Sequence, residues 1–350
     1  MKEIIKEILE SAIYAPSGEN TQPWKFRLKD DGIDVFNVPE RDISLYNFRQ
    51  QGLLVAHGAL IENIIIASSA MGYKADINTF PDKEDSNHVA SITLNKTEIG
   101  DEPLYPYIKK RATNRKPYYP EPLTNEEKDT LLELNKSGFG KVALLEDQKT
   151  VQELADALCI NERMVFENRH LHKFFFEHMR WTEKEALEKR DGMYIKTMEL
   201  PPPVILLFKL LFKRWRLVKI LGIAKFIAKQ TKKMYLAAPA IGIITIDSDS
   251  SGDFLKGGRL MQRVWLEATR MGLSLHPSAG TIFLIQRALK GATEDFTQEN
   301  VEMIEFVHQK LKSAFKLHNE TIAFLFRIGR SDPPSAYSPR LSLEQLIIAP

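Results

Sequence analysis

The first residues of the chain show the spacing of an amphipathic helix. Charged Lys and Glu residues separate apolar ones that recur three and four positions apart: Ile4, Ile5, Ile8, Leu9 and Ala12. This period places the apolar side chains on one face, so it predicts a helix over residues 1–14. A signal peptide would instead need an uncharged apolar core and a small-residue cleavage site. We therefore interpret the segment as part of the mature fold.

Hydrophobic periods and turn residues predict helices and strands along the rest of the chain. Strands are expected near 24–28, 32–38, 88–95, 141–146, 240–246, 273–276 and 321–328, with 88–95 at a sheet edge. Helices are expected over 52–71, 124–136, 148–190, 254–271 and 297–313. Thr124, followed three residues later by Glu127, has the pattern of a capping box at a helix start. Helices mixed with strands in this way indicate a layered sheet of the α+β or α/β class.

Two stretches of the sequence match each other at a displacement of 200 residues. The identical positions are Gly58, Leu60, Met71 and Gly72, which recur as Gly258, Leu260, Met271 and Gly272. Each stretch is typical of a core helix that ends at a left-handed glycine and is followed by a strand. Buried helices often carry leucine and a terminal glycine, but a match at one register over fifteen residues favours duplication. With the charged turn at 100–103 as boundary, we predict two related halves, residues 1–100 and 101–350.

The segment 204–234 is both strongly apolar and basic. Its cations interrupt every apolar stretch well short of the roughly 20 residues that a membrane span needs. Two interpretations remain: a lid-like helical insertion over about 195–236 that packs on the protein, or a helix lying on an anionic membrane surface. Packed helices are commoner, which favours the lid. In a lid, Leu206, Leu207, Leu210, Leu211 and Trp215 would be buried, and Lys209, Lys213 and Lys219 would face water.

Composition narrows the function classes. The 350 residues are 43% hydrophobic and 27% charged, as in ordinary globular proteins. Lys and Arg total 48 and Asp and Glu total 46, a balance that argues against a nucleic-acid partner. The single cysteine, Cys159, excludes an internal disulfide framework and fits a reducing compartment, so a cytoplasmic location is expected.

A basic cluster offers the first candidate chemistry. Arg111, Thr113 and Arg115 alternate, and an extended backbone would point all three side chains to the same side. Two guanidinium groups and a hydroxyl suit a phosphate and the electron-rich edge of a flavin. The alternative is a solvated basic turn, because further cations flank the cluster: Lys109, Lys110 and Lys116.

A second motif lies near the N-terminus and is more specific. The string that begins Pro16-Ser17 and continues through Asn20 and Gln22 to Pro23-Trp24 resembles the Pro-Ser-x-x-Asn-x-Gln-Pro-Trp signature of the nitroreductase family of FMN enzymes. A capped turn before a strand would account for the Ser and the second Pro but not for the whole string. The resemblance implies FMN as cofactor, with Pro16, Ser17, Asn20 and Gln22 at the flavin.

Three further segments extend the resemblance. Arg111-x-Thr113-x-Arg115 is similar to the family's Arg-x-Ser-x-Arg/Lys motif, with Thr in place of Ser. Ser338-Pro339-Arg340 resembles the end of the family's C-terminal strand, which implies that Arg340 binds phosphate. The segment 272–280 resembles the family's Gly-x-x-x-Pro stretch, which implies that backbone N–H groups of this segment point at N5 or O4 of the flavin and that Pro277, Ser278 and Ala279 contact the cofactor. His276 is given no acid–base role.

The motifs depart from the family in their order. In the family's homodimers, two subunits build each site, and each subunit carries the Arg cluster before the Asn-x-Gln-Pro-Trp motif. Here residues 1–14 contain no Arg cluster, and no second motif follows Arg115. The chain therefore resembles the Acg branch of FMN-binding oxidoreductases, which are single chains built as fused dimers. This implies a nitroreductase-like α+β fold, one complete site and a monomer.

The resemblance also implies a reaction. Such an enzyme takes hydride from NAD(P)H onto N5 of FMN and passes electrons to a nitroaromatic, quinone or similar small acceptor. Arg115 would stabilise the reduced flavin, and neither a catalytic protein side chain nor a metal is required. The alternative is a non-catalytic FMN storage or sequestration protein whose lid covers the ring. Dehydrogenation of a modified peptide occurs in the superfamily, but no residue of this sequence points to it.

Overall fold

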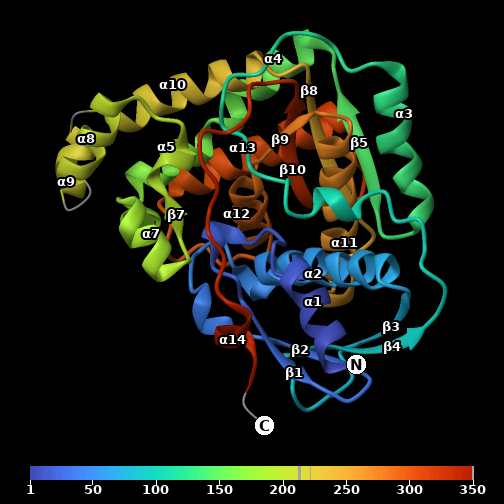
Figure 1. The fold of residues 1–350 in the computed structure, drawn as a ribbon. Helices are drawn as coiled ribbons and strands as arrows, with labels where there is room; N and C mark the ends of the chain where they lie inside the picture. Colours follow the sequence, from blue (N-terminus) through green and yellow to red (C-terminus); the bar gives the residue numbers. More distant parts are fainter. Residues whose placement is uncertain (212–213, 221, 349–350) are drawn as a thin grey trace.

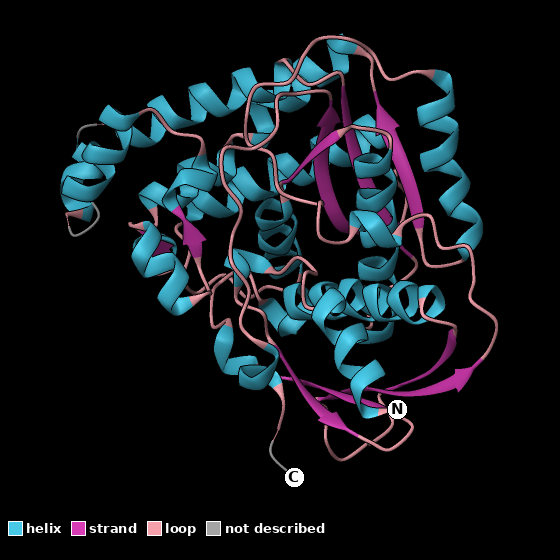
Figure 2. Ribbon diagram, viewed as in Figure 1, coloured by secondary structure: helices cyan, strands magenta, loops and turns pink. Residues whose placement is uncertain are grey.

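The computed structural model describes residues 1–211, 214–220 and 222–348 (Figure 1). Two four-stranded antiparallel sheets organise the fold, with helices between and around them (Figure 2). The first sheet has the order β1-β2-β4-β3, with β1 Trp24–Leu28, β2 Gly32–Asn37, β4 His88–Lys96 and β3 Tyr73–Thr79. The second has the order β5-β8-β10-β9, with β5 Lys141–Leu145, β8 Ala240–Ile246, β10 Thr321–Gly329 and β9 Ser274–Pro277. The predicted α+β class is confirmed.

The two sheets share one arrangement. In the first, helix α2 (Gln51–Ala70) follows β2 and leads into the edge strand β3. In the second, helix α11 (Ser251–Arg270) follows β8 and leads into the edge strand β9. Both helices end before a left-handed glycine, Gly72 with φ 78° and Gly272 with φ 76°. The two helices therefore begin and end at positions that are 200 residues apart, the displacement seen in the sequence. Each of them also occupies the same place in the chain order of its sheet, before an edge strand.

Helices α2 and α11 cross at the matching glycines. A Cβ atom on Gly58 would lie 2.1 Å from the carbonyl oxygen of Leu255, and one on Gly258 would lie 2.1 Å from that of Val55. Only a residue without a side chain permits so close a backbone approach. Next to the crossing, the buried carboxylate of Glu62 accepts a 2.8 Å hydrogen bond from Nε of Arg259.

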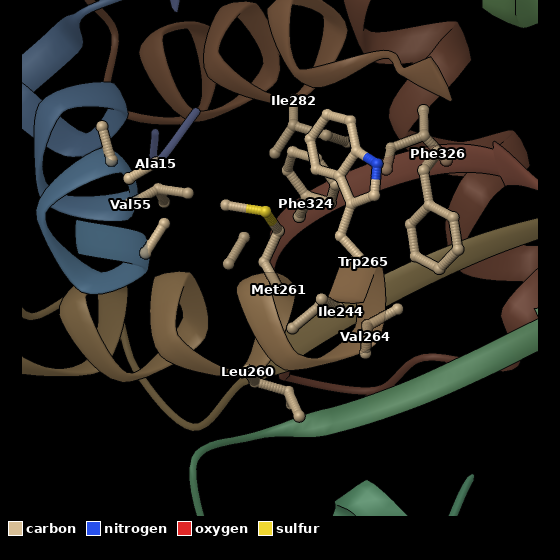
Figure 3. Close-up of a cluster of buried hydrophobic side chains, with 14 of the residues drawn as sticks. Ala15, Val55, Ile244, Leu260, Met261, Val264, Trp265, Ile282, Phe324 and Phe326 are labelled. Carbon is tan, nitrogen blue, oxygen red and sulfur yellow. The ribbon is translucent and has the colours of Figure 1, made fainter. Parts of the chain in front are cut away.

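The hydrophobic core fills the space between the two sheets. All seven residues of β8 are buried, as expected for a strand covered on both faces. Trp265 of α11 lies among Phe324 and Phe326 of β10 and Ile282 (Figure 3), with the Trp265 and Phe324 ring centroids 6.4 Å apart. Helix α2 with its preceding turn, Phe48–Ala70, is the one described helix long and apolar enough to cross a membrane, and 83% of its apolar window is buried inside the fold.

The remaining elements are mostly helical, and many occupy two long connections, between β5 and β8 and between β9 and β10. The capping box of Thr124 and Glu127 is confirmed at the start of α3. These elements are α1 Lys2–Ala12, α3 Asn125–Glu133, α4 Gln148–Leu158, α5 Ile160–Glu167, α6 Arg169–Glu177, α7 Glu183–Lys189, α8 Pro202–Leu211, α9 Trp215–Ile220, α10 Ile223–Leu236, α12 Ala279–Leu289, α13 Gln298–Phe315, α14 Leu343–Leu346 and the short parallel pair β6 Met179–Arg180 and β7 Met193–Tyr194.

Two predictions about secondary structure are wrong. Strand β4 lies inside its sheet, between β2 and β3, and the edge is formed by β3. Alternating residues identify a strand but do not say which neighbours it pairs with. Helix α12 was not expected, because its first residues were interpreted as part of a flavin-binding loop.

The predicted burial of leucines in the basic apolar segment is also wrong. Leu206, Leu207 and Leu210 of α8 are 59%, 40% and 57% exposed, whereas Phe208 is 5% exposed. Every residue of α8 except Lys209 is apolar, and the inner side of the helix packs through Phe208. Lys209 is exposed as predicted, and Trp215 is half-buried. The predictions for Leu211, Lys213 and Lys219 fall outside the described side chains.

The close crossing of α2 and α11 predicts that adding a side chain at Gly58 lowers the stability of the fold. Gly58→Ala places a methyl group against the Leu255 carbonyl, so we expect the free energy of unfolding to fall by about 1–3 kcal/mol, as in an overpacked core. Urea unfolding followed by circular dichroism measures it. Gly252→Ala, in the first turn of α11 with no atom within 4 Å of the added Cβ, is the control and should not destabilise. Equal effects of the two substitutions would contradict a tight crossing.

Candidate functional site

Three segments far apart in the sequence meet at the main-chain carbonyl of Tyr14. Arg111 donates to this oxygen from Nη2 at 2.9 Å, and Arg340 donates to it from Nη2 at 3.3 Å. Arg340 also donates from Nη1 to Oδ1 of Asn20 at 2.9 Å. The structure thus brings together a residue of the N-terminal motif, one of the basic cluster and one of the C-terminal segment.

Arg111 and Arg340 form a cation pair without a counter-charge. Among the residues that the structure describes, no carboxylate makes an ion pair with either guanidinium group. The Nε atoms of both are buried without a hydrogen-bond partner. Burial lowers the pKa of Arg111 to about 9, with the neighbouring Arg340 as a second cause, and lowers the pKa of Arg340 to about 10. A buried and a partly buried cation with free donors form an environment that a phosphate would neutralise.

The aromatic ring beneath Arg111 belongs to the core. Its guanidinium carbon lies 4.4 Å from the centroid of the Trp265 ring of α11. The guanidinium plane is thereby held against a rigid surface, which preorganises its donors. The position of this cation therefore depends on the packing of α11.

Arg115 belongs to a second group of cations. It donates from Nη1 to the carbonyl oxygen of Thr197 at 3.0 Å, and burial lowers its pKa to about 10. The guanidinium carbon of Arg327 lies 3.9 Å from the centroid of the Tyr118 ring, and its Nη1 is buried without a partner. Burial and these two arginines hold the pKa of His276 well below its usual range, so the imidazole is neutral.

Arg327 was missed in the sequence analysis. It is 2% exposed and lies in β10, a strand that is otherwise apolar apart from its first residue, Thr321. A single Arg inside such a strand was the available signal, because a buried cation needs a partner or a ligand.

Thr113 lies between the two arginine groups. It forms an isolated parallel bridge with Leu275 of β9, and the adjacent Asn114 donates its backbone N–H to the Leu275 carbonyl at 3.1 Å. Arg111 and Arg115 therefore make separate contacts on either side of a residue that is attached to the second sheet.

The loop that carries the N-terminal motif has an unusual backbone. Glu19, Asn20 and Gln22 have φ values of 44°, 57° and 49°, in the left-handed region that non-glycine residues rarely adopt. The hydroxyl of Ser17 accepts the backbone N–H of Gln22 at 2.9 Å, which holds the turn. Pro16 precedes it, partly buried. Strain concentrated in one loop is typical of functional sites.

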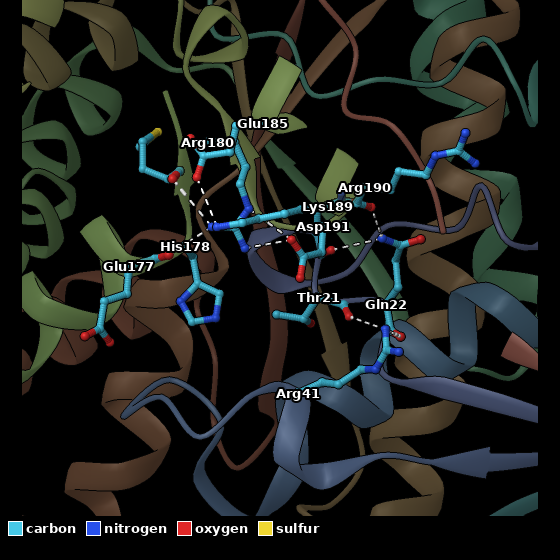
Figure 4. A network of polar contacts seen from close by, with 12 residues as sticks. Thr21, Gln22, Arg41, Glu177, His178, Arg180, Glu185, Lys189, Arg190 and Asp191 are labelled. Carbon is cyan, nitrogen blue, oxygen red and sulfur yellow. Dashed lines mark hydrogen bonds and ion pairs between the residues drawn. The ribbon is translucent and has the colours of Figure 1, made fainter. Parts of the chain in front are cut away.

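Gln22 connects this loop to two other segments. Its side chain is fully buried, and Nε2 donates to the carbonyl oxygen of Arg190 at 2.8 Å (Figure 4). Its Oε1 accepts the backbone N–H of Leu341 at 2.8 Å. Asn20 adds a bond from Nδ2 to the carbonyl oxygen of Pro339 at 3.0 Å. These two motif residues fix the C-terminal segment and thereby the position of Arg340.

Glu19 supplies a titratable group that the motif did not predict, because it occupies a variable position. The pKa of its carboxyl is raised to about 8, first by burial and then by nearby Asp42, while Arg115 acts in the opposite direction. The pKa of Asp42 is raised as well, mainly by burial. The site therefore contains a carboxyl group that changes charge near neutral pH.

The segment Pro277, Ser278 and Ala279 lies at the junction of β9 and α12. Ser278 donates its backbone N–H to the carbonyl oxygen of Leu325 at 2.7 Å, so this donor is already used within the fold. Ala279 begins α12, whose first-turn N–H groups have no intrahelical acceptor. The free donors expected here therefore come from the start of the helix.

Both ends of the segment 195–236 reach the site. At one end, the carbonyl oxygen of Thr197 accepts a hydrogen bond from Arg115. At the other end, the hydroxyl of Tyr235 lies 2.5 Å from that of Ser278. Helices α8 and α9, between these ends, lie at the edge of the molecule (Figure 1). Within the described residues, no group of three or more His, Cys, Asp or Glu side chains is placed to hold a metal ion.

Relatives of the chain are known from sequence comparison, although no family model matches it. The uncharacterized protein MT1398 of Mycobacterium tuberculosis is 25% identical over 343 residues, 95% of this chain and 46% of that protein. The putative NAD(P)H nitroreductase MT3217 of the same organism is 29% identical over 118 residues, 33% of this chain and 34% of that protein. Its putative NAD(P)H nitroreductase acg is 28% identical over 97 residues, 28% and 29% of the two chains. The chain thus spans less than half the length of these relatives.

Solved structures show weaker likeness. The FMN-dependent nitroreductase NfnB of Mycobacterium smegmatis, in complex with NADPH, is 15% identical, with 69% of this chain and 96% of that chain covered and a TM-score of 0.38. A nitroreductase of Bacteroides fragilis with bound FMN is 11% identical, with 68% and 94% covered and a TM-score of 0.36. These likenesses are too weak to define the fold.

Fold and site together define an α+β protein of two matching sheet-and-helix units, with a pair of arginines, Arg111 and Arg340, that no described carboxylate neutralises. Its sequence is similar in part to two proteins named putative NAD(P)H nitroreductases, which agrees with the resemblance seen in the N-terminal motif.

The raised pKa of Glu19 predicts a pH dependence of stability. Its carboxyl is protonated in both states at low pH, but between about pH 4.5 and 8 only the unfolded state loses the proton. Rising pH in this window therefore destabilises the fold through Glu19. The advantage of Glu19→Gln over the unsubstituted protein should grow across the window by roughly 1–3 kcal/mol. Urea unfolding of the flavin-free protein across the window measures it. Glu10→Gln, at an exposed position of α1, is the control, and a difference independent of pH would contradict the assignment.

Proposed function

We propose that the chain is an FMN-dependent oxidoreductase that uses NAD(P)H to reduce a nitroaromatic, a quinone or a similar small acceptor. The observation that carries the proposal is the pair of the buried Arg111 and the partly buried Arg340, whose Nε donors are free and which have no counter-charge. A phosphate group dianion would compensate both charges and satisfy the free donors. The names of the mycobacterial relatives support the same class of activity.

The protein's residues would position the cofactor and tune its charge. FMN, when bound, would accept hydride from NAD(P)H and pass electrons to the acceptor. Arg111 and Arg340 would hold the phosphate. Arg115, preorganised by the Thr197 carbonyl, and Arg327 would stabilise negative charge on the ring. The free N–H groups at the start of α12 would donate along the ring edge.

The N-terminal motif would act by holding the residues that bind the cofactor in position. Ser17 holds the left-handed turn, and Asn20 and Gln22 fix Arg340 and the chain around it. We infer that Pro16, Ser17, Asn20 and Gln22 form one wall of the flavin site. The matching strand orders of the two sheets support two related halves, 1–100 and 101–350, that complete the site in a monomer. A cytoplasmic location remains a prediction.

A second candidate function is FMN storage without turnover. It is favoured by the contacts of the segment 195–236, whose ends bond to Arg115 and to Ser278. Such a segment would restrict access of nicotinamide to the ring. In that case the contacts of Arg115 and Ser278 with the segment would keep the cofactor bound and would have no part in its reduction.

The cation pair predicts the affinity for FMN. Arg111→Ala and Arg340→Ala should each weaken binding by about 2–4 kcal/mol, because each removes a charge-assisted donor from a desolvated anion. Fluorescence titration of the flavin-free protein with FMN measures it. Arg270→Ala, which removes a surface partner of Glu267, is the matched control. We expect one FMN per chain in a monomer by chromatography and light scattering. Unchanged affinity in both site variants would show that the phosphate lies elsewhere.

Flavin reduction separates the two candidate functions. An enzyme should lose its visible flavin absorbance within the time of mixing when NADPH is added without oxygen, and recover it when a quinone or nitroaromatic is added. A storage protein should keep its absorbance under the same conditions. Free FMN with NADPH is the control for the uncatalysed reaction. Persistence of the oxidised spectrum with both NADH and NADPH would contradict the oxidoreductase.

A further inference from the structure

The outer side of helix α8 is apolar apart from Lys209, and its leucines are not covered by the described protein. Its inner side is occupied by Phe208, whose ring centroid lies 5.6 Å from that of Phe166 and 5.8 Å from that of Phe176. The outer side carries Leu206 and Leu210, one turn apart, which are 59% and 57% exposed. A helix that is apolar on all sides is normally covered on all sides. The outer side of α8 is therefore an apolar surface that no other segment of the described protein buries.

The uncovered apolar surface continues along the chain. We call residues 202–236, within which α8, α9 and α10 lie, the arm. Leu217 of α9 and Phe226 of α10 are 42% and 58% exposed. Five of the fourteen exposed large hydrophobic side chains of the described protein lie on this tenth of the chain. The arm lies at the edge of the molecule, at the upper left of Figure 1, where an extended surface can reach it.

The charge of the arm selects the kind of partner. From residue 200 to residue 246 the sequence contains no Asp or Glu, although the chain as a whole is nearly balanced. The exposed side chains of the arm include Lys209, Arg214, Arg216, Lys225 and Lys229. A second copy of the arm would set cations against cations, which is unfavourable. A partner must instead offer negative charge above an apolar layer.

An anionic lipid bilayer has these two properties. Its headgroups attract Lys and Arg, and its acyl boundary accepts apolar side chains to a depth of roughly 5–10 Å. Helix α8, with 10 residues, is about 15 Å long, half the thickness of a hydrocarbon core, so it would lie in the plane of the surface.

We propose that the arm docks the protein on an anionic membrane surface. Leu206, Leu207, Leu210, Leu217 and Phe226 enter the headgroup boundary, and the neighbouring Lys and Arg side chains bind lipid phosphates. This proposal does not depend on FMN binding or on the oxidoreductase activity. It also accounts for the failure of the leucines to be buried as a packed lid requires.

Co-sedimentation with vesicles tests the proposal. The full chain should bind vesicles of equal phosphatidylcholine and phosphatidylglycerol about tenfold or more tightly than vesicles of phosphatidylcholine alone, and salt should weaken the binding. The double variant Leu206→Ser, Leu210→Ser and the double variant Arg214→Glu, Arg216→Glu should each lose about tenfold in affinity. Leu289→Ser, an equally exposed leucine on α12, and Lys184→Glu, an exposed cation on α7, are the matched controls and should bind normally.

Each other outcome overturns the proposal. Absence of binding to the anionic vesicles, or equal binding to both kinds, would exclude an anionic surface as the partner. A dimer in light scattering that the leucine variant dissociates, without vesicle binding, would identify a second copy as the occupant. If a variant fails to fold, hydrogen exchange of the unsubstituted protein decides: vesicles should protect amides of the arm, and protection confined to other segments would contradict docking through it.

Discussion

The rest of the structure depends on the contact between two helix backbones at Gly58 and Gly258. The contact brings the axes of α2 and α11 closer than side chains would allow. Because α2 connects strands of the first sheet and α11 connects strands of the second, this contact sets the distance between the two sheets. The same approach aligns a short polar seam, where Gln262 Nε2 donates to Asn63 Oδ1 at 2.7 Å. Because α11 is fixed in this way, Trp265 lies where its ring can support Arg111. The candidate site is thus a consequence of the helix crossing.

The site in turn holds charge that its own residues do not neutralise. Burying a guanidinium group without a counter-ion is unfavourable, and here Arg111 and Arg340 share one carbonyl acceptor. The strained loop containing Asn20 and the fully buried Gln22 keeps Arg340 in this position. Strain and uncompensated charge both lower the stability of the free protein, and an anionic ligand would relieve the charge. A fold retains such features when binding compensates for them.

The sequence predicted what local patterns determine. Helix and strand positions, the Thr124 capping box and the equivalence of Gly58 with Gly258 follow from periods and from residues with special backbone freedom. Interactions between distant residues were not accessible in this way. Arg327 approaches the site because β10 pairs with β9, the inner position of β4 depends on its partners, and the pKa of Glu19 depends on burial by several segments. The burial of the leucines of the arm was predicted wrongly, because an apolar residue in a sequence does not show which other segment covers it.

The two sheets differ in the length of their connections. In the first sheet, β1 and β2 are joined by residues 29–31, and β3 and β4 by residues 80–87. The corresponding connections in the second sheet run over 146–239 and 278–320, and they contain Thr197, Tyr235 and Ser278. These long connections supply contacts to Arg115 and to the start of α12 that the short turns of the first sheet have no residues to make. Two sheets of the same strand order therefore have unequal surroundings. Loop length, more than the shared core, decides at which end the described cations gather.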